Sequence, residues 1–432
     1  MDSKALTKIQ SVILASIIVV AAVCGGIAYV LLSSNGQISD AIKIGICADL
    51  DSVEGSAIWQ GAVLAAEQVN AEGGVLGRDL EIVAEDDDSE TPPFDIAVST
   101  NAMNRLITVH KVDFIINGYA TLVSQDIACQ HKKILFCIMN TQDNLTQRVD
   151  EDYDTYKYFF RSGIPNGTSA IDGTVESLEV CREHTGFNKV ALVRHEIAGP
   201  EAAFVADLEG HGFEVVYSAN VPLETVDFSS YFAKAEAAGA EILYPLILGQ
   251  AGVPFVKEYS ERQSPMVMWG YVVMAAMNNF WELTEGKCEY VSTNGFPVVT
   301  GYPLTTKTIS TREAYVERWN QAITNFAGTT FDTVRFILPD AIKRAGTTET
   351  EAVIAALEKT EVETSMARRF VFTSSHDIFV GEAGPNRPAE EYFLVCLFQW
   401  QDGVQVPVYP IEIMEEAGAT YKYPPWRGPW SK

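Results

Sequence analysis

The 432-residue sequence lacks the short motifs by which many hydrolytic and nucleotide-binding enzymes are recognised. It contains no G-x-S-x-G nucleophile elbow, no G-x-G-x-x-G turn and no P-loop, which disfavours an α/β hydrolase and a site for a dinucleotide or a nucleoside triphosphate. Its six histidines show no H-E-x-x-H or other close ligand spacing, and its seven cysteines include no C-x-x-C pair. We therefore expect a protein that is not an enzyme and that holds neither a metal nor a cofactor.

Basic residues are also scarce. The chain has 31 Lys and Arg against 57 Asp and Glu, a formal net charge of −26 at pH 7. An acidic surface disfavours nucleic acid and anionic membrane surfaces as partners. The hydrophobic content of 47% and the charged content of 20% are ordinary for a globular protein and argue against extensive disorder.

Charge is absent altogether from residues 9–39, and residues 11–32 are nearly all Val, Ile, Leu, Ala and Gly. A run of this length is enough to span a bilayer as a helix. Lys4 and Lys8 precede it, which places residues 1–10 in the cytoplasm and the rest of the chain outside. We expect a single-pass anchor in the cell membrane, followed by a short linker at residues 33–40 and an extracytoplasmic domain.

A cleaved signal peptide is the alternative interpretation of the apolar run, although its core is usually shorter. Cys24 lies within the run and raises the further alternative of a lipid-modified N-terminus, but Val23 before it is a poor match for the small residue expected there. The other six cysteines are expected to be buried thiols, with one or two disulfides left open because an exported location permits them. They are Cys47, Cys129, Cys137, Cys181, Cys288 and Cys396.

Residues 42–88 predict a β-α-β unit. Alternating isoleucines begin a strand at Ile42, apolar residues recur at helical spacing over residues 58–69, and a second strand begins at Leu80. A short crossover of this kind implies a parallel sheet, and ligands of such sheets bind beyond the carboxyl ends of the strands. The loop at residues 49–56 is therefore the first candidate region for a binding site.

The alternation of strand, loop and helix continues along the chain, which is typical of an α/β fold with helices covering parallel sheets. Further strands are predicted at residues 112–116, 133–139, 189–193, 213–217, 241–246, 266–269 and 391–400. Further helices are predicted at residues 94–107, 123–131, 173–184, 201–210, 227–238, 311–325, 329–345 and 349–357. Asp86, Asp87 and Asp88 follow the second strand and are expected to form a solvated acidic loop rather than a cation site.

The order of residues in 42–88 resembles the opening of the type I periplasmic-binding-protein family. The similarity is to its branch of leucine- and branched-chain amino-acid-binding proteins of ABC importers. The most specific piece is NAEGGVLGR at residues 70–78, and YFFRSGIPNGT at residues 158–168 also fits the family. The resemblance covers roughly residues 42–410. It departs from the family at residues 49–55, where a Thr-Gly-Pro-like loop is usual.

This resemblance implies two Rossmann-like lobes, each a parallel sheet flanked by helices, joined by three hinge crossings. The crossings are expected near residues 161–165, 297–301 and 372–376. The first ligand-binding lobe is expected at residues 41–162 plus 300–372, the second at residues 163–299 plus 373–412, with an unassigned C-terminal tail at residues 413–432.

A binding site requires concave walls with a few oriented polar groups, and loops that lead from a strand into a helix supply N–H groups that favour a carboxylate. Each candidate residue lies in a predicted strand-end loop. In the first lobe the candidates are Ser52, Glu54, Tyr119, Ala120, Thr121, Asn140 and Thr141. In the second lobe they are Glu196, Ile197, Leu248, Gln250 and Tyr271.

The second lobe departs from the family in two places that concern the ligand. Leucine-binding relatives carry an acidic residue for the ligand's ammonium group near the strand end at which this chain has Tyr271. The aromatic residue that often precedes a glycine in the second-lobe loop is absent from residues 196–199. An amino acid remains open as the ligand if Glu54 or Glu196 substitutes, and so do an amide and a urea-like compound.

The expected function is that of an extracytoplasmic solute-binding protein of an ABC importer. It would capture a small polar solute in the cleft between its lobes by hinge closure and deliver it to a permease. A ligand-sensing receptor ectodomain of the same fold is the alternative, disfavoured because no signalling domain follows in the sequence. A secreted α/β hydrolase is a weaker alternative because the nucleophile elbow is missing.

Overall fold

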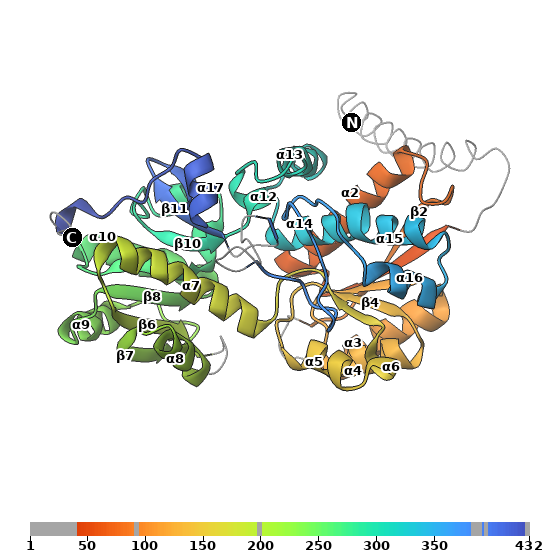
Figure 1. Cartoon of the computed structure of the whole chain (residues 1–432), viewed down its shortest axis with the longest axis horizontal. Helices are drawn as coiled ribbons and strands as arrows, with labels where there is room; N and C mark the ends of the chain where they lie inside the picture. Colours follow the sequence, from red (N-terminus) through yellow and green to blue (C-terminus); the bar gives the residue numbers. More distant parts are fainter. Residues whose placement is uncertain (1–40, 90–94, 197–200, 382–390, 393–395, 428–432) are drawn as a thin grey trace, which may run out of the picture. The chain divides into compact units, whose positions relative to one another are not determined.

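Two α/β lobes, each built on its own sheet, make up the computed structural model of the chain (Figure 1). The structure describes residues 41–89, 95–196, 201–381, 391–392 and 396–427. The expected anchor at residues 11–32 lies outside these ranges, as does Cys24. Within the described ranges, no helix combines the length and the apolarity that crossing a membrane requires.

The first lobe contains a parallel five-stranded sheet in the order β2-β1-β3-β4-β5. Its strands are β1 (Ile42–Ala48), β2 (Leu80–Asp86), β3 (Phe114–Asn117), β4 (Ile134–Cys137) and β5 (Phe159–Arg161). β3, β4 and β5 are buried along their whole length. Burial on both faces explains why these strands are short continuous apolar runs rather than alternating ones.

Helices cover both faces of this sheet (Figure 1). They are α2 (Val53–Ala71), α3 (Ile96–Arg105), α4 (Leu122–Gln130), α5 (Asn144–Glu151), α6 (Tyr153–Tyr156), α12 (Pro297–Thr300), α13 (Thr308–Trp319), α14 (Asn325–Asp332), α15 (Leu338–Ala345) and α16 (Thr350–Leu357). A π-helical turn at Leu106–His110 extends α3, and another at Thr333–Ile337 joins α14 to α15. Ile44 packs in one core with α2 and with α13 to α16, whereas Cys47 packs in the other core with α3 to α5.

The second lobe contains a seven-stranded sheet in the order β12-β11-β10-β9-β8-β6-β7. Its strands are β6 (Lys189–His195), β7 (Glu214–Val221), β8 (Ile242–Ile247), β9 (Val267–Val272), β10 (Ser292–Gly295), β11 (Cys396–Gln401) and β12 (Val404–Tyr409). β6 to β10 are parallel, and β11 and β12 add an antiparallel edge. The helices are α7 (Gly167–Thr185), α8 (Glu201–Gly210), α9 (Ser229–Ala237), α10 (Gly252–Arg262), α11 (Phe280–Leu283) and α17 (Ile411–Glu416).

The chain passes between the two sheets more than once. It leaves the first lobe between β5 and α7, and it returns between β10 and α13. It passes again between Ile378, which belongs to the first lobe's core, and β11 of the second sheet. The expectation of a two-lobed α/β fold is confirmed.

Several boundaries differ from those predicted, each because of a local cap. The first helix begins at Val53 rather than near residue 58, since the Ser52 side chain accepts a hydrogen bond from Gly55 N–H. The predicted helix at residues 311–325 is two helices, because Asn320 adopts a left-handed conformation with φ 51° and ends α13. Thr324 then caps α14.

Two other expectations can be compared with the structure. The predicted strand at residues 391–400 is observed as β11 from Cys396, and residues 393–395 lie outside the described ranges. The six cysteines of the described residues are all buried, and none of them forms a disulfide there, as expected.

The C-terminal tail, which had no assigned role, packs on the second lobe. Gln399 of β11 exchanges two hydrogen bonds of 2.8 Å with the backbone of Lys422. The ring of Tyr421 lies 5.0 Å from that of Trp269, and the indole N–H of Trp426 donates to Ser264 O at 3.0 Å. The described part of the tail is therefore an integral element of this lobe.

Candidate functional site

The candidate site of the first lobe lies where the connections of its sheet change direction, between β1 and β3. Open α/β sheets bind ligands at such points, beyond the carboxyl ends of the strands. Gly118 follows β3, and a Cβ there would lie 3.0 Å from the Ala48 side chain and 3.2 Å from that of Ile58. The absence of a side chain lets the turn after β3 lie close against the end of β1.

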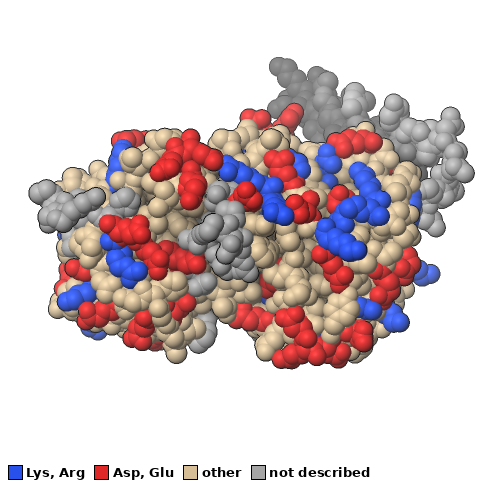
Figure 2. Space-filling model, in the orientation of Figure 1, with Lys and Arg blue, Asp and Glu red and all other residues tan. Residues whose placement is uncertain are grey.

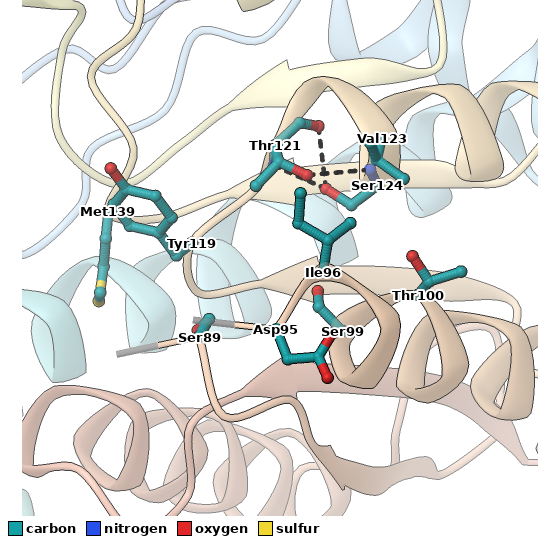
Figure 3. A pocket seen from close by; sticks show the side chains of 10 residues that line it. All are labelled: Ser89, Asp95, Ile96, Ser99, Thr100, Tyr119, Thr121, Val123, Ser124 and Met139. Atoms are coloured by element: carbon teal, nitrogen blue, oxygen red, sulfur yellow. Dashed lines mark hydrogen bonds between the residues drawn. The ribbon is translucent and has the colours of Figure 1, made fainter. Parts of the chain in front are cut away.

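A pocket of about 420 Å³ opens at this edge of the sheet (Figure 3). It is lined by Ser89, Asp95, Ile96, Ser99, Thr100, Tyr119, Thr121, Val123, Ser124 and Met139. Tyr119 and Thr121 were among the candidates predicted from the sequence. Tyr119, Ile96 and Val123 are exposed, at 40%, 65% and 41%, so the pocket offers carbon surface to a ligand.

The hydroxyl groups of Thr121 and Ser124 hold the start of α4 (Figure 3). Thr121 Oγ1 accepts from Ser124 N–H at 3.2 Å, and Ser124 Oγ accepts from Thr121 N–H at 2.7 Å. This is a reciprocal capping box. The first turn of a helix carries N–H groups without partners inside the helix, and here two side chains of the pocket wall hold that turn in place.

The candidates after β1 are also part of a helix start. Ser52 Oγ accepts from Gly55 N–H at 2.8 Å and donates to Asp49 O at 2.8 Å. Glu54 lies half-buried in the first turn of α2. Residues 49–56 were expected to be a loop, and this was wrong beyond Ser52, since the side-chain cap starts the helix early.

Three candidates in the loops after β3 and β4 divide between buried and partly exposed positions. Ala120 and Asn140 are buried, and Asn140 Nδ2 donates to Ala120 O at 2.6 Å. Asn140 Oδ1 accepts from Gln142 N–H at 2.8 Å, so the amide joins the β3 and β4 loops. Thr141 is half-buried.

The acidic residues after β2 do not all face solvent. Asp88 is exposed as expected, but the expectation was wrong for Asp87, which is fully buried. The Asp87 carboxylate accepts from Ser89 N–H at 3.1 Å and from the Cys47 thiol at 3.4 Å, and burial raises its pKa. Among the residues that the structure describes, no group of three or more His, Cys, Asp or Glu side chains is placed to hold a metal ion.

The second lobe has an equivalent edge between β6 and β8. His195 ends β6, is fully buried, and accepts from Leu248 N–H through Nδ1 at 3.0 Å. Burial lowers the pKa of His195, which favours the neutral ring with its proton on Nε2. Sequence reasoning missed His195, although its position at the end of a strand and beside Glu196 was a usable signal.

The predicted residues of this edge lie in different settings. Glu196 and Gln250 are exposed, Leu248 is half-buried, and Ile197 lies outside the described ranges. Tyr271 was expected at the end of its strand, and it is the penultimate residue of β9, where it pairs with Leu246. Burial raises the pKa of Tyr271 to about 12, so its hydroxyl is a neutral donor at physiological pH.

Residues 41–382 match the family model described as periplasmic binding protein. The chain belongs to the periplasmic binding protein family. The resemblance seen in residues 42–88 is therefore confirmed.

Solved structures of binding proteins share this fold at low sequence identity. A structure from Silicibacter pomeroyi, described as a branched-chain amino acid ABC transporter protein, has a TM-score of 0.78 and 19% identity, with 90% of this chain and 100% of that chain covered. LivJ from Streptococcus pneumoniae in complex with isoleucine has a TM-score of 0.65 and 19% identity, covering 85% and 100%. A solute-binding protein from R. palustris in complex with benzoate has a TM-score of 0.64 and 17% identity, covering 85% and 95%. No curated protein sequence matches the chain.

Much of the pocket of this binding protein was not predicted from the sequence. Met139 lies two residues beyond the end of β4, so its position near the strand end was a readable signal. Ile96, Ser99 and Thr100 come from α3, and Val123 comes from α4. No local pattern shows that the starts of these two helices line one pocket, because that depends on how they pack on the sheet.

Proposed function

We propose that this binding protein captures a small solute between its two lobes and delivers it to the permease of an ABC importer, without covalent chemistry. The observation that carries the proposal is the pocket at the edge of the first sheet, with Tyr119 and Thr121 in its wall. Its place beyond the strand ends is where α/β lobes bind ligands.

The pocket supports a solute with a small polar head and an apolar body. Its described lining combines hydroxyl groups with the apolar side chains of Ile96, Val123 and Met139, and Asp95 is the one charged residue among them. A carboxylate or amide carbonyl would be held by the N–H groups at the start of α4. An amino acid or amide with an apolar side chain fits this lining better than a urea-like compound does. The isoleucine and benzoate of the relatives from Streptococcus pneumoniae and R. palustris have this combination.

The remaining parts of the proposal concern the architecture. Residues 11–32 would hold the protein to the membrane, with the binding domain outside the cell. The lobes would comprise residues 41–162 plus 300–372 and residues 163–299 plus 373–412, and would close on the solute by hinge motion. Figure 2 shows Asp and Glu side chains on both lobes of the face in view, in keeping with the exclusion of nucleic acid.

A thermal-shift screen of the full chain in mild detergent tests the proposal. The compounds are L-leucine, L-isoleucine, benzoate, acetamide and urea. A ligand at 100 times its dissociation constant stabilises the folded state by about 2.7 kcal/mol, so a bound compound raises the melting temperature measurably. We expect L-leucine, L-isoleucine or benzoate to do so, and urea to have no effect.

A pair of matched variants then locates the site by calorimetry. Val123→Asn replaces an apolar side chain in the pocket wall, and Val109→Asn makes the same change at an exposed valine that is not part of the wall. Loss of the apolar contact is worth about 1–2 kcal/mol, which corresponds to a roughly tenfold weaker affinity in Val123→Asn. Full affinity in Val123→Asn, or an equal loss in Val109→Asn, would rule out this pocket as the site.

A further inference from the structure

Arg161, the last residue of β5, makes a buried contact with Asp377, which precedes the passage of the chain to β11. Its side chain is fully buried, and Nε lies 3.0 Å from Oδ1 of Asp377, which is also buried. Nη2 donates to Gln142 O at 2.7 Å, and Nη1 donates to Asn140 O. One guanidinium group therefore contacts two carbonyls of the loop after β4 and a carboxylate that lies between Phe372 and Ile378 of the first lobe's core, before the chain passes to β11.

The carboxylate of Asp377 also accepts hydrogen bonds from one side chain of each lobe. Thr146 Oγ1, on α5 of the first lobe, donates to Asp377 Oδ2 at 2.9 Å. Asn166 Nδ2 donates to the same oxygen at 2.9 Å, and Asn166 is the residue that caps α7 of the second lobe. Any displacement of α7 relative to the first lobe therefore acts on Asp377.

The loop after β4 is also bonded directly to the start of α7. Gly167 N–H donates to Thr141 O at 2.7 Å. Thr168 donates to the Asp143 carboxylate through N–H at 3.2 Å and through Oγ1 at 2.7 Å. This loop directly follows Met139 of the pocket wall and carries the predicted residues Asn140 and Thr141, so a stretch of chain next to the pocket also takes part in the connection between the lobes.

We propose that Arg161 is a positioning residue that couples the ligand loop to the hinge, a role that rests on the function proposed above. We call the group of Arg161, Asp377 and the carbonyls of Asn140 and Gln142 the latch. Its contacts are kept only while the segment around Asp377 and the loop after β4 stay in their present arrangement. A guanidinium group has a planar fork of donors, and a buried charge that loses its partner is strongly unfavourable. A hinge motion that displaces Asp377 would therefore also change the conformation of residues 140–143.

The test uses the full chain in mild detergent without any ligand. Spin labels at Gln130→Cys on α4 and Glu209→Cys on α8, both exposed, report the distance between the lobes. Cys24→Ser is included throughout, and the six other native cysteines are buried and do not compete for the label. Hydrogen exchange of the amides of residues 140–143 is measured on the same proteins.

The variants separate the latch from general stability. Arg161→Lys keeps the charge but loses the fork, and Asp377→Asn keeps the shape but loses the charge. Thr146→Val keeps both charges and removes one hydrogen bond to Asp377, which provides a variant that folds if the others do not. The control is Arg148→Lys, because Arg148 pairs with Asp126 at 2.5 Å within the first lobe.

We expect each latch variant to exchange the amides of residues 140–143 about tenfold faster and to widen the distribution of interlobe distances, with Arg148→Lys unchanged in both. A residue with a purely structural role would lower the melting temperature and leave the interlobe distance unchanged well below it. Unchanged distances and exchange in folded variants would overturn the proposal. So would a change in only one readout, or an equal change in the control. Because no ligand is added, these outcomes are independent of whether the solute screen succeeds.

Discussion

Gly61 allows α2 and α14 to pack with their backbones in contact, and Gly61→Ala tests how much stability this contact requires. A Cβ at position 61 would lie 2.3 Å from the carbonyl oxygen of Ala327 and 3.1 Å from its Cα. Both are backbone atoms of a neighbouring helix, so they cannot move aside by a side-chain rotation. The two helices would have to separate to make room for one methyl group.

The expected loss follows from two opposing contributions. Inserting a methyl group into a well-packed interface costs about 1–3 kcal/mol, and a rigid backbone contact favours the upper part of this range. Replacing a helical glycine by alanine recovers about 1 kcal/mol of helix propensity. We therefore expect Gly61→Ala to lower the free energy of unfolding by about 1–2 kcal/mol.

Gly210→Ala is the matched control, since Gly210 ends α8 and nothing lies within 4 Å of its Cβ position. It should be neutral or stabilise by up to about 1 kcal/mol. Urea unfolding of the full chain, followed by circular dichroism, measures both variants against the parent. A Gly61→Ala variant as stable as the parent would refute the reasoning, because the close backbone contact would then have been relieved at no cost.

Three further predictions concern single side chains. Thr121→Ala should lower the free energy of unfolding by about 1 kcal/mol through loss of the helix cap, while Thr121→Ser should retain it; an equal loss in both would show that the hydroxyl does not cap α4. Burial raises the pKa of Asp332 from 3.8 to about 6. The folded state therefore binds this proton more tightly than the unfolded state does, which stabilises the fold below pH 4, and this stabilisation is lost as the pH rises through 6. The stability of the parent relative to Asp332→Asn should therefore increase as the pH falls from 7 to 4, by at most about 1.4 kcal/mol per pH unit, and a pH-independent difference in urea titrations would contradict it. Burial raises the pKa of thiols such as Cys129 and Cys396 to about 12. In a Cys24→Ser variant, Ellman's reagent should therefore react with the remaining thiols only after the protein unfolds, and rapid reaction of the folded protein at pH 8 would contradict their burial.

The family and the two-lobed α/β fold could be predicted from the sequence because they depend on local patterns. Apolar runs such as Phe114–Asn117 and the helical spacing within α2 repeat the strand–helix alternation, and each is set by residues close in the chain. The strand-end positions of Tyr119 and Thr121 followed from the same alternation, and both line the pocket. Helix boundaries were less accurate because a cap such as Ser52 depends on one hydrogen bond rather than on a period.

Only the tertiary structure decided which polar groups are committed to the fold. Asp87 resembles its solvated neighbour Asp88 in the sequence, yet it is buried because it lies against Cys47 of the adjacent strand. Arg161 and Asp377 are far apart in the chain, and their ion pair forms because the segment around Asp377 packs beside the end of β5. Burial and pairing depend on the packing of distant segments, and a local pattern of polar and apolar residues contains no information about which of them will touch.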